Sequence, residues 1–280
     1  MTKNLIIKTS YSKLPDGSIK TNFGDLIRST ILIECIGNDF LWLTDSKSIP
    51  LLKYFIDEKK ILNLEEVKEL EAETIYNLDN YISESFNKIR GNWRGYIWDG
   101  KVLTPENKKI ESITPPYENL ENSWQQTFIE SFNFKWKKQD YPLNITQKEK
   151  FDIGFNWHVN PEWKTKQWHY WKELEKELAD YSISWQEGLD NFEKYIKWLS
   201  SCRVIITCET LGLHLASALR KKIIAIVGPL DGKEYHYNRI SFIKPKEREC
   251  MPCNLRDCKF KEPCLNEIST KEIINVLHNN

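Results

Sequence analysis

The chain has 280 residues, of which 40 are basic and 40 are acidic, so its formal net charge at pH 7 is zero. This balance excludes the overall basic field that is typical of proteins binding nucleic acid or anionic membranes. Hydrophobic residues make up 40% of the chain and charged residues 29%, which is the composition of a soluble globular protein, and the length allows two compact domains.

The sequence carries no signal for the membrane or for export. Its apolar runs are all shorter than the roughly 20 residues that a bilayer-spanning helix needs. The first ten residues lack the long apolar region of a signal peptide and lead directly into an expected strand. We therefore expect a cytoplasmic protein, in which the seven cysteines suggest metal binding or free thiols before disulfides.

The first half begins with a short apolar strand at Leu5–Ile7, followed by a polar stretch from Thr9 to Phe23. That stretch is long for a connection between a strand and a helix, and we expect it to be disordered or functional. A helix is expected to open at Gly24 and Asp25. The glycine allows close backbone approach, and an acidic residue in the first turn interacts favourably with the helix dipole, so a purely structural role for Asp25 is also open.

Further elements alternate along the first half. Residues 40–44 and 74–78 predict strands, residues 94–101 and 108–114 predict strands only weakly, and residues 49–55 and 124–134 predict helices. The charged segment 135–150 contains a proline and few apolar residues, which is typical of a domain boundary. We therefore expect one domain over residues 1–145 and a second over 150–280.

The second half repeats the alternation. A strand is expected at 153–157, followed by a polar and aromatic loop over 158–168 and amphipathic helices around 171–178 and 192–199. Strands alternating with helices in both halves predict an α/β protein of two doubly wound domains that face a cleft.

A strand–turn–helix–strand unit over 204–229 is the clearest pattern in the chain. Two β-branched apolar strands, 204–208 and 223–227, flank a short helix over 213–219. Ligands of parallel sheets bind at the carboxyl ends of the strands, where helix N-termini offer free N–H groups. Glu209, Thr210 and His214 fall at that edge. They predict either a ligand site or a capped turn with one satisfied histidine.

Four cysteines lie close together near the C-terminus, at Cys250, Cys253, Cys258 and Cys264. As thiolates they suit one tetrahedral ion, with zinc as the default and iron as an alternative. With all four positions filled by protein, such an ion would be structural. Free thiols or two labile disulfides remain the alternative. The chain ends in an expected helix that opens on Ser269 and Glu272 with the spacing of a capping box.

Taken together, these segments resemble glycosyltransferase family 9, the heptosyltransferase-like enzymes of the two-domain GT-B fold. The resemblance runs through most of the chain and depends on the order and spacing of several motifs. They are Gly24-Asp25-Leu26-Ile27-Arg28-Ser29-Thr30, Trp42-Leu43-Thr44-Asp45, Trp163-Lys164-Thr165-Lys166-Gln167-Trp168, Glu209-Thr210-Leu211-Gly212-Leu213-His214, Gly228-Pro229 and the cysteine cluster.

The resemblance implies an inverting transfer of a sugar, with heptose favoured, from a nucleotide-diphosphate donor such as ADP-heptose to an acceptor hydroxyl, without a catalytic metal. The first domain would face the acceptor and supply Asp25 as general base. The second would bind the donor through Thr165, Lys166, Glu209, Thr210, Leu211, Gly212 and His214. The acceptor would be a glycan, a protein or a small molecule. Lys164 and Lys166 could exchange roles on the donor phosphates.

The sequence also departs from the family pattern. The usual Asp-Thr-Gly at the donor site is here Glu209-Thr210-Leu211, with the glycine displaced to Gly212, and the first domain is short. These departures keep a non-catalytic binding or assembly subunit open as an alternative. An epimerase on the same fold is disfavoured by the Gly24–Asp25 helix start. A nucleic-acid-binding zinc ribbon is disfavoured because acidic residues interleave with the basic ones around the cysteines.

Overall fold

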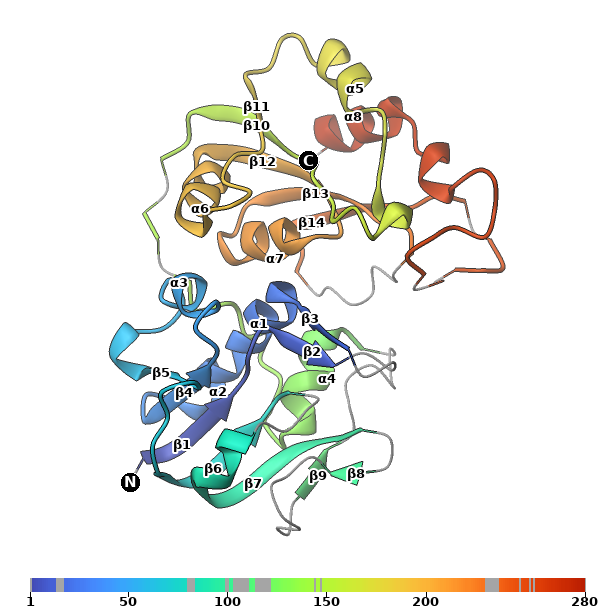
Figure 1. Ribbon diagram of the computed structural model, residues 1–280. Coiled ribbons are helices and arrows are strands. Elements are labelled where there is room, and N and C mark those ends of the chain that lie inside the picture. The colour runs from blue at the N-terminus through green and yellow to red at the C-terminus, as the bar shows by residue number, and fades with distance from the viewer. Residues whose placement is uncertain are drawn as a thin grey trace. The chain divides into compact units, whose positions relative to one another are not determined.

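The computed structural model describes residues 2–13, 18–79, 84–98, 101–102, 111–113, 122–143, 145–146, 148–229, 237–246, 248–251, 253 and 255–279. The chain divides into two compact units, Met1–Asn144 and Ile145–Asn280, each built on its own sheet (Figure 1). The boundary between the two units falls inside the charged segment 135–150.

The N-terminal unit is built on a mainly parallel sheet in the order β5-β4-β1-β6-β7. Its strands are β1 (Thr2–Ile7), β4 (Phe40–Thr44), β5 (Ile61–Asn63), β6 (Leu70–Asn77) and β7 (Ile89–Trp98), with the short β8 (Lys101–Val102) antiparallel and β9 (Glu111–Ile113) parallel to β7. The central strand β1 is buried on both faces, because Leu5, Ile6 and Ile7 are each at most 1% exposed. Such two-sided burial explains why the strand is continuously apolar.

Helices of this unit are short. They are α1 (Phe23–Ser29), α2 (Ile33–Ile36), α3 (Ile49–Leu52) and α4 (Trp124–Ser131), with 3-10 turns η1 (Thr30–Leu32), η2 (Glu58–Lys60) and η3 (Glu84–Lys88). The expected helix over 24–36 therefore forms as α1, η1 and α2 in succession. It begins at Asn22, whose side-chain oxygen accepts a hydrogen bond from the backbone N–H of Asp25.

The polar stretch before Asp25 is not a structureless loop. It forms an antiparallel pair of strands, β2 (Tyr11–Lys13) and β3 (Ile19–Thr21), and residues 14–17 lie outside the described part of the chain. A hydrogen bond from Asn22 N–H to the Ser10 carbonyl, 2.6 Å long, closes the base of this pair. Cross-strand pairing satisfies the backbone polar groups that a polar loop would otherwise leave to water.

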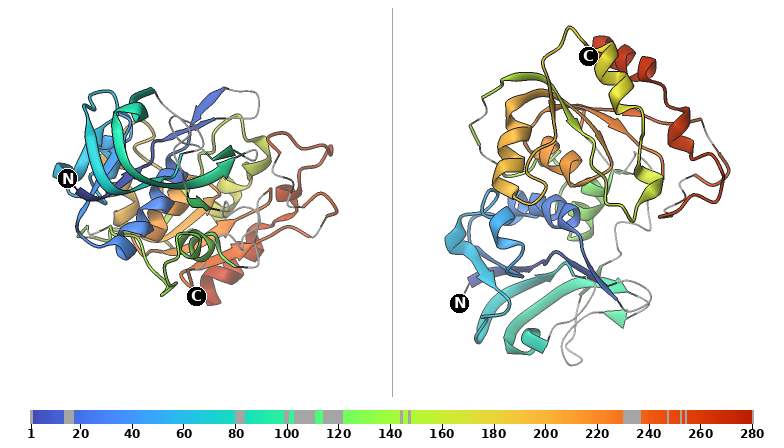
Figure 2. Two further views of the ribbon diagram at one scale, coloured as in Figure 1. Left: turned by 90° about the horizontal axis from the view of Figure 1, so that it is seen from below. Right: turned by 45° about the horizontal axis from the view of Figure 1, so that its top comes forward.

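The C-terminal unit carries a five-stranded parallel sheet in the order β11-β10-β12-β13-β14. The strands are β10 (Phe151–Asn156), β11 (Ile183–Trp185), β12 (Cys202–Cys208), β13 (Lys222–Ile226) and β14 (Ile240–Ile243). Helices α5 (Trp171–Glu177) and α8 (Thr270–Asn279) cover one face, and α6 (Phe192–Ser201) and α7 (Leu211–Ala218) cover the other (Figures 1 and 2). Turns η4 (Lys164–Lys166) and η6 (Cys264–Glu267) lie in the connecting segments.

The two parallel sheets with their helices confirm the expected α/β class. The strands expected at 40–44, 153–157 and 204–208 and the helices at 192–199 and 213–219 all form, within a few residues at their ends. The weak strand prediction at 94–101 falls on the second half of β7 and the start of β8, and the one at 108–114 falls on β9. Residues 99–100, 103–110 and 114 lie outside the described part of the chain. Strands β5, β11 and β14 were not expected. Each is only three or four residues long, too short to show a period.

The capping box at the last helix is confirmed. The Ser269 hydroxyl lies 3.4 Å from the Glu272 N–H, and the Glu272 carboxylate accepts from the Ser269 N–H at 2.7 Å. Among the helices of the described residues, none is long and apolar enough to cross a membrane.

Candidate functional site

Asp25 is held by its own helix start. Its backbone N–H is capped by Asn22 at 3.2 Å, and the Asn22 side-chain amide donates to its Oδ2. Arg28 Nη2, one turn further along α1, lies 2.6 Å from its Oδ1. The Asp25 side chain is 23% exposed and the Arg28 side chain 7% exposed. Both carboxylate oxygens are therefore oriented by neighbours, while the group keeps access to solvent.

Arg28 is itself fixed by helix α4. Its guanidinium carbon lies 4.2 Å from the ring centroid of Trp124, within the range of a cation–π contact. Trp124 is 3% exposed and stacks on Phe128 with 4.6 Å between ring centroids. No role for Arg28 was expected from the sequence. Its spacing of three residues from Asp25 was the available signal, because side chains three apart on a helix lie on one face.

Two other aspartates lie at the carboxyl ends of the strands next to β1. The carboxylate of Asp79 is fully buried and accepts from Lys8 Nζ at 2.9 Å and from the N–H and hydroxyl of Thr9. Burial raises the pKa of Asp79, and the Lys8 ammonium opposes that rise. Asp45 similarly accepts from the Ser10 backbone and from the Ser48 hydroxyl. These bonds engage both carboxylates internally, so we assign both residues to bracing the segment that follows β1.

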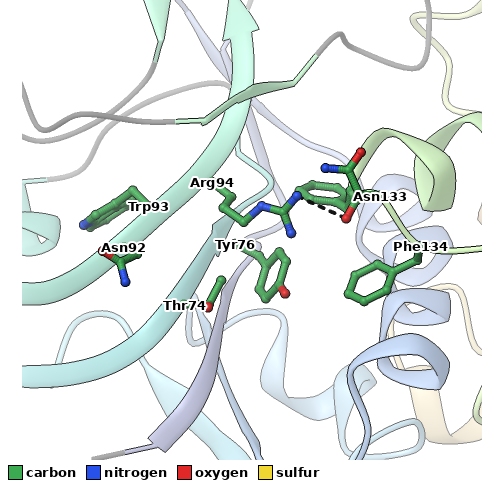
Figure 3. Close-up of a pocket in the computed structure, with 8 residues that line it drawn as sticks. Thr74, Tyr76, Asn92, Trp93, Arg94, Asn133 and Phe134 are labelled. Atoms are coloured by element: carbon green, nitrogen blue, oxygen red, sulfur yellow. Dashed lines mark hydrogen bonds between the residues drawn. The ribbon is translucent and has the colours of Figure 1, made fainter.

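The N-terminal unit also carries a pocket of about 540 Å³ (Figure 3). Thr74 and Tyr76 on β6 are paired in register with Asn92 and Arg94 on β7, so these four side chains share one face of the sheet. Arg94 Nη2 donates to the Phe132 carbonyl at 3.1 Å, and its guanidinium carbon lies 5.6 Å from the Tyr76 ring centroid. The turn after α4 forms the opposite wall, and none of the residues predicted as site residues lines the pocket.

In the C-terminal unit, the N-terminus of α7 is locked to the neighbouring strand by a buried polar network. Asn156, the last residue of β10, donates to the hydroxyls of Thr207 at 2.7 Å and Thr210 at 2.8 Å. Tyr195 donates to the Asn156 side-chain oxygen at 2.5 Å, and burial raises the pKa of Tyr195 so that it remains a donor. Thr210 in turn caps α7 by accepting from Gly212 N–H at 3.2 Å.

The displaced glycine of this motif has a packing reason. A Cβ placed on Gly212 would lie 2.3 Å from Asn156 Nδ2 and 2.4 Å from the Tyr195 hydroxyl. Both distances are far below contact, so the position admits no side chain while the network is intact. Thr210 and Gly212 were expected at this site from the sequence, whereas Asn156 and Tyr195 were not. Their only signal was a polar residue at a strand end and a tyrosine in an amphipathic helix.

The charged residues predicted for the donor gather at the end of β12. Glu209 is 5% exposed and His214 is 8% exposed. Burial raises the pKa of the neighbouring Cys208 thiol to about 12, and both the Glu209 carboxylate and the Lys166 ammonium act on that thiol. The structure therefore brings Glu209 and Lys166 to the same end of the sheet.

Lys164 and Lys166 have different surroundings. Lys166 Nζ lies 4.5 Å from the Trp163 ring centroid, and its side chain is partly buried. The Lys164 side chain is 69% exposed and pairs with Asp257 at 2.9 Å. The Lys164 ammonium is thus engaged by an ion pair at the surface, and the predicted contact of either lysine with a donor phosphate stays a prediction.

Thr165 connects this loop to the cysteine-containing segment. It is 5% exposed, its hydroxyl donates to the Leu255 carbonyl at 2.5 Å, and its N–H donates to the Arg256 carbonyl at 3.2 Å. The structure gives Thr165 a bracing role between η4 and residues 255–256, and its predicted contact with a donor stays a prediction.

The four clustered cysteines are free thiols of intermediate burial. Burial raises the pKa of the Cys264 thiol, and the nearby Arg248 guanidinium lowers it. Within the described residues, however, no three Cys, His, Asp or Glu side chains are arranged to hold a metal ion. The metal-bound knot stays a prediction.

Comparison with known proteins places this fold among sugar-transferring enzymes. No family model and no curated protein matches the sequence. Among solved structures, the E. coli heptosyltransferase WaaC with ADP matches with a TM-score of 0.68 and 13% identity, over 99% of both chains. A family 9 glycosyltransferase from Veillonella parvula matches with a TM-score of 0.69 and 11% identity, over 99% of this chain and 96% of that one.

A third structure is the iron-containing dodecameric glycosyltransferase TibC from E. coli, with a TM-score of 0.55 and 12% identity. It matches over 99% of this chain and 76% of that one. At these identities the likeness concerns the fold. The chain therefore has the fold of the heptosyltransferases and of family 9 glycosyltransferases, as the resemblance of its motifs indicated.

Proposed function

We propose that this protein is an inverting glycosyltransferase that moves a sugar, with a heptose favoured, from a nucleotide-diphosphate donor to an acceptor hydroxyl. The observation that carries the proposal is the Asp25 carboxylate, which is oriented through both oxygens yet partly exposed, on a fold shared with heptosyltransferases. The acceptor would be a hydroxyl of a glycan, a protein or a small molecule.

In the proposed reaction Asp25 is the general base. It takes the proton from the acceptor hydroxyl while the acceptor oxygen forms a bond to the anomeric carbon of the donor sugar. The bond from that carbon to the diphosphate oxygen breaks on the opposite side, so the configuration inverts and the nucleoside diphosphate leaves. Arg28, 2.6 Å from Asp25, favours the ionised carboxylate and so keeps the base ready.

The leaving diphosphate gains negative charge, which requires donors that are already in place. Lys166 and the N-terminus of α7 would supply them, and the network of Thr210, Asn156 and Tyr195 would hold that helix end in position. Glu209 would accept hydrogen bonds from hydroxyls of the donor sugar, and His214 would line the same site.

We further propose that Cys250, Cys253, Cys258 and Cys264 hold a structural zinc or iron ion. Four thiolates suit either metal, and the four cysteines lie within fifteen residues of one another in the sequence. The ion would take no part in transfer. Metal content measured by mass spectrometry should fall in a Cys253→Ser variant, with a lower melting temperature; a purified wild-type protein that contains no metal would exclude this site.

The first experiment is a thermal-shift screen with ADP-, GDP-, UDP-, CDP- and dTDP-linked sugars, followed by a transfer assay with the donor that binds. A ligand at a hundredfold excess over its dissociation constant adds about 2.7 kcal/mol to the free energy of unfolding. Asp25→Asn should retain donor binding and lose about 10²–10⁴-fold in turnover, the contribution typical of a general base.

Asp39→Asn is the matched control, because Asp39 is an exposed acidic residue of the same unit that bonds to the start of β1. Near-normal turnover by Asp25→Asn would refute the assigned base. Absence of binding to every nucleotide sugar would favour the alternative, a non-catalytic binding or assembly subunit with the same fold.

A further inference from the structure

Trp157 is exposed although it lies at the edge of a well-packed sheet. It exposes 42% of its surface, whereas Trp168, Trp171 and Trp198 of the same unit expose between 2% and 5%. Indole is the largest apolar side chain, and leaving it in water forgoes a substantial hydrophobic gain. Exposed aromatic rings next to a candidate ligand site therefore call for a partner.

Trp157 directly follows strand β10, at a place where sheets of this kind bind ligands. Strand β11 lies next to β10 on one side, and the following strand, β12, lies next to β10 on the other side. The direction in which strands are added to the sheet therefore reverses between β10 and β12. Doubly wound sheets bind ligands outside the carboxyl ends of the strands at such a point. Trp157 directly follows β10 and Glu209 directly follows β12, and the two strands are paired with Asn156 opposite Thr207.

We infer that Trp157 is the stacking platform for the nucleobase of the donor, an inference that rests on the proposed function. A planar base has a π-face that stacks on indole whichever base it is. The predicted diphosphate ligands, Lys166 and the α7 N-terminus, belong to the same edge of the sheet. A nucleotide is the class of donor that carries both a diphosphate and a planar ring.

The backbone on either side of Trp157 is hydrogen-bonded to residue 186 of the neighbouring segment. The backbone N–H of His158 donates to Gln186 Oε1 at 3.0 Å, and the N–H of Gln186 donates to the Phe155 carbonyl at 3.0 Å. Trp157 meets the rings of His158 and Trp185 at 84° and 70°. These steep angles mean that neither neighbour is stacked parallel on the indole of Trp157.

A second exposed apolar side chain extends from the neighbouring strand. Leu189 is 56% exposed in the loop after β11, the strand paired with β10. That loop turns at Gly188, which has φ +75° and whose added Cβ would lie 2.3 Å from the backbone nitrogen of Tyr195. Only glycine suits this conformation and this close approach. Trp157 and Leu189 thus both present exposed apolar surface in the segments that follow two paired strands.

The test compares ligands that share a diphosphate and differ in the base. Dissociation constants of ADP, UDP and inorganic pyrophosphate would be measured by calorimetry on the full chain and on Trp157→Ala, Trp157→Phe and Phe260→Ala. Phe260 is the control because it is an aromatic residue of the same unit with 52% exposure, outside the proposed site. Melting temperatures of all variants should stay close to that of the wild type, since the replaced rings are exposed.

Trp157→Ala should weaken ADP and UDP by about 5- to 150-fold, the range measured for loss of one base–aromatic stack, and leave pyrophosphate unchanged. Trp157→Phe should recover most of the loss, and Phe260→Ala should change nothing. If Trp157→Ala weakens pyrophosphate binding as much as nucleotide binding, or leaves the binding of both nucleotides unchanged, Trp157 is not the stacking platform. The proposed donor class would still stand. If the wild-type protein binds none of the three, both the platform and the proposed function fail.

Discussion

Arg28 and Asp25 form an ion pair across one turn of α1, with 2.6 Å between Nη2 and Oδ1, in which the cation is the more buried partner. Breaking a buried pair by removing one partner typically costs about 3–5 kcal/mol, because the other charge loses its compensation. Asp25 keeps some exposure, so we expect a cost near the lower end. Loss of this ion pair should therefore affect both the stability of the fold and the ionisation of the proposed base.

For Arg28→Met we predict that the acidic limb of the pH profile of kcat/KM moves to higher pH. Removing the cation makes the Asp25 carboxylate hold a proton more strongly, so a higher pH is needed to ionise the base. Arg28→Lys keeps the positive charge and should bring the acidic limb most of the way back to its wild-type pH. Arg203→Met, which removes an exposed pair with Asp152, is the control and should leave the profile unchanged. If kcat/KM of Arg28→Met is lower at every pH but the acidic limb keeps its wild-type position, Arg28 contributes to folding only.

For Gly212→Ala we predict lower stability and weaker donor binding. The added methyl would collide with Asn156 and the Tyr195 hydroxyl, and overpacking of this kind costs about 1–3 kcal/mol. Removing that hydroxyl in Tyr195→Phe should reduce the cost of Gly212→Ala, which a double-mutant cycle of urea unfolding would measure. Strictly additive losses would show that the methyl is accommodated elsewhere.

For the buried Lys8–Asp79 pair we predict a defined dependence of stability on pH. Burial raises the pKa of Asp79 in the folded chain above its ordinary value of 3.8. At pH values between 3.8 and the folded-state pKa, the folded chain therefore binds more protons than the unfolded chain. The stability that this extra proton binding adds to the folded state is therefore fully present below pH 3.8 and is lost as the pH rises through the folded-state pKa of Asp79. Urea unfolding across this range should show it in the wild type and not in Asp79→Asn.

Asp79→Asn should also lose about 3–5 kcal/mol near neutral pH, because it leaves the Lys8 ammonium buried without its counterion. The double variant Lys8→Met/Asp79→Asn should recover much of this loss. A double variant as unstable as the single one would contradict the assignment of the cost to an uncompensated charge.

For Thr165→Val we predict a loss of about 1 kcal/mol in stability, since the variant leaves the Leu255 carbonyl without its 2.5 Å donor. We also expect a rise in the dissociation constant of pyrophosphate, because the loop that carries Lys166 loses its tie to residues 255–256. Thr165→Ser keeps the hydroxyl and should behave as the wild type in both calorimetry and thermal unfolding. Equal weakening by the serine variant would point to the methyl group of Thr165 instead.

Local patterns in the sequence determined the α/β class, the helix start at Gly24 and Asp25, and the capping box at Ser269 and Glu272. Each of these depends on residues within one strand or one helical turn. The strand 204–208 was readable because a strand buried on both faces must be apolar throughout. Strands β2 and β3 within residues 9–23 were not predicted, because their pairing depends on contacts between two segments that are separated in the chain.

Only the tertiary structure decided which distant residues complete these sites. It brought Trp124 against Arg28, Leu255 against Thr165, and Asn156 and Tyr195 against Gly212. It also set Thr74 and Tyr76 opposite Asn92 and Arg94. Hydrophobic period specifies which face of a strand or helix is buried, but not which element covers that face or in what register. Those choices follow from strand order and packing, and they alone placed Trp157 at the point where the order of the second sheet reverses.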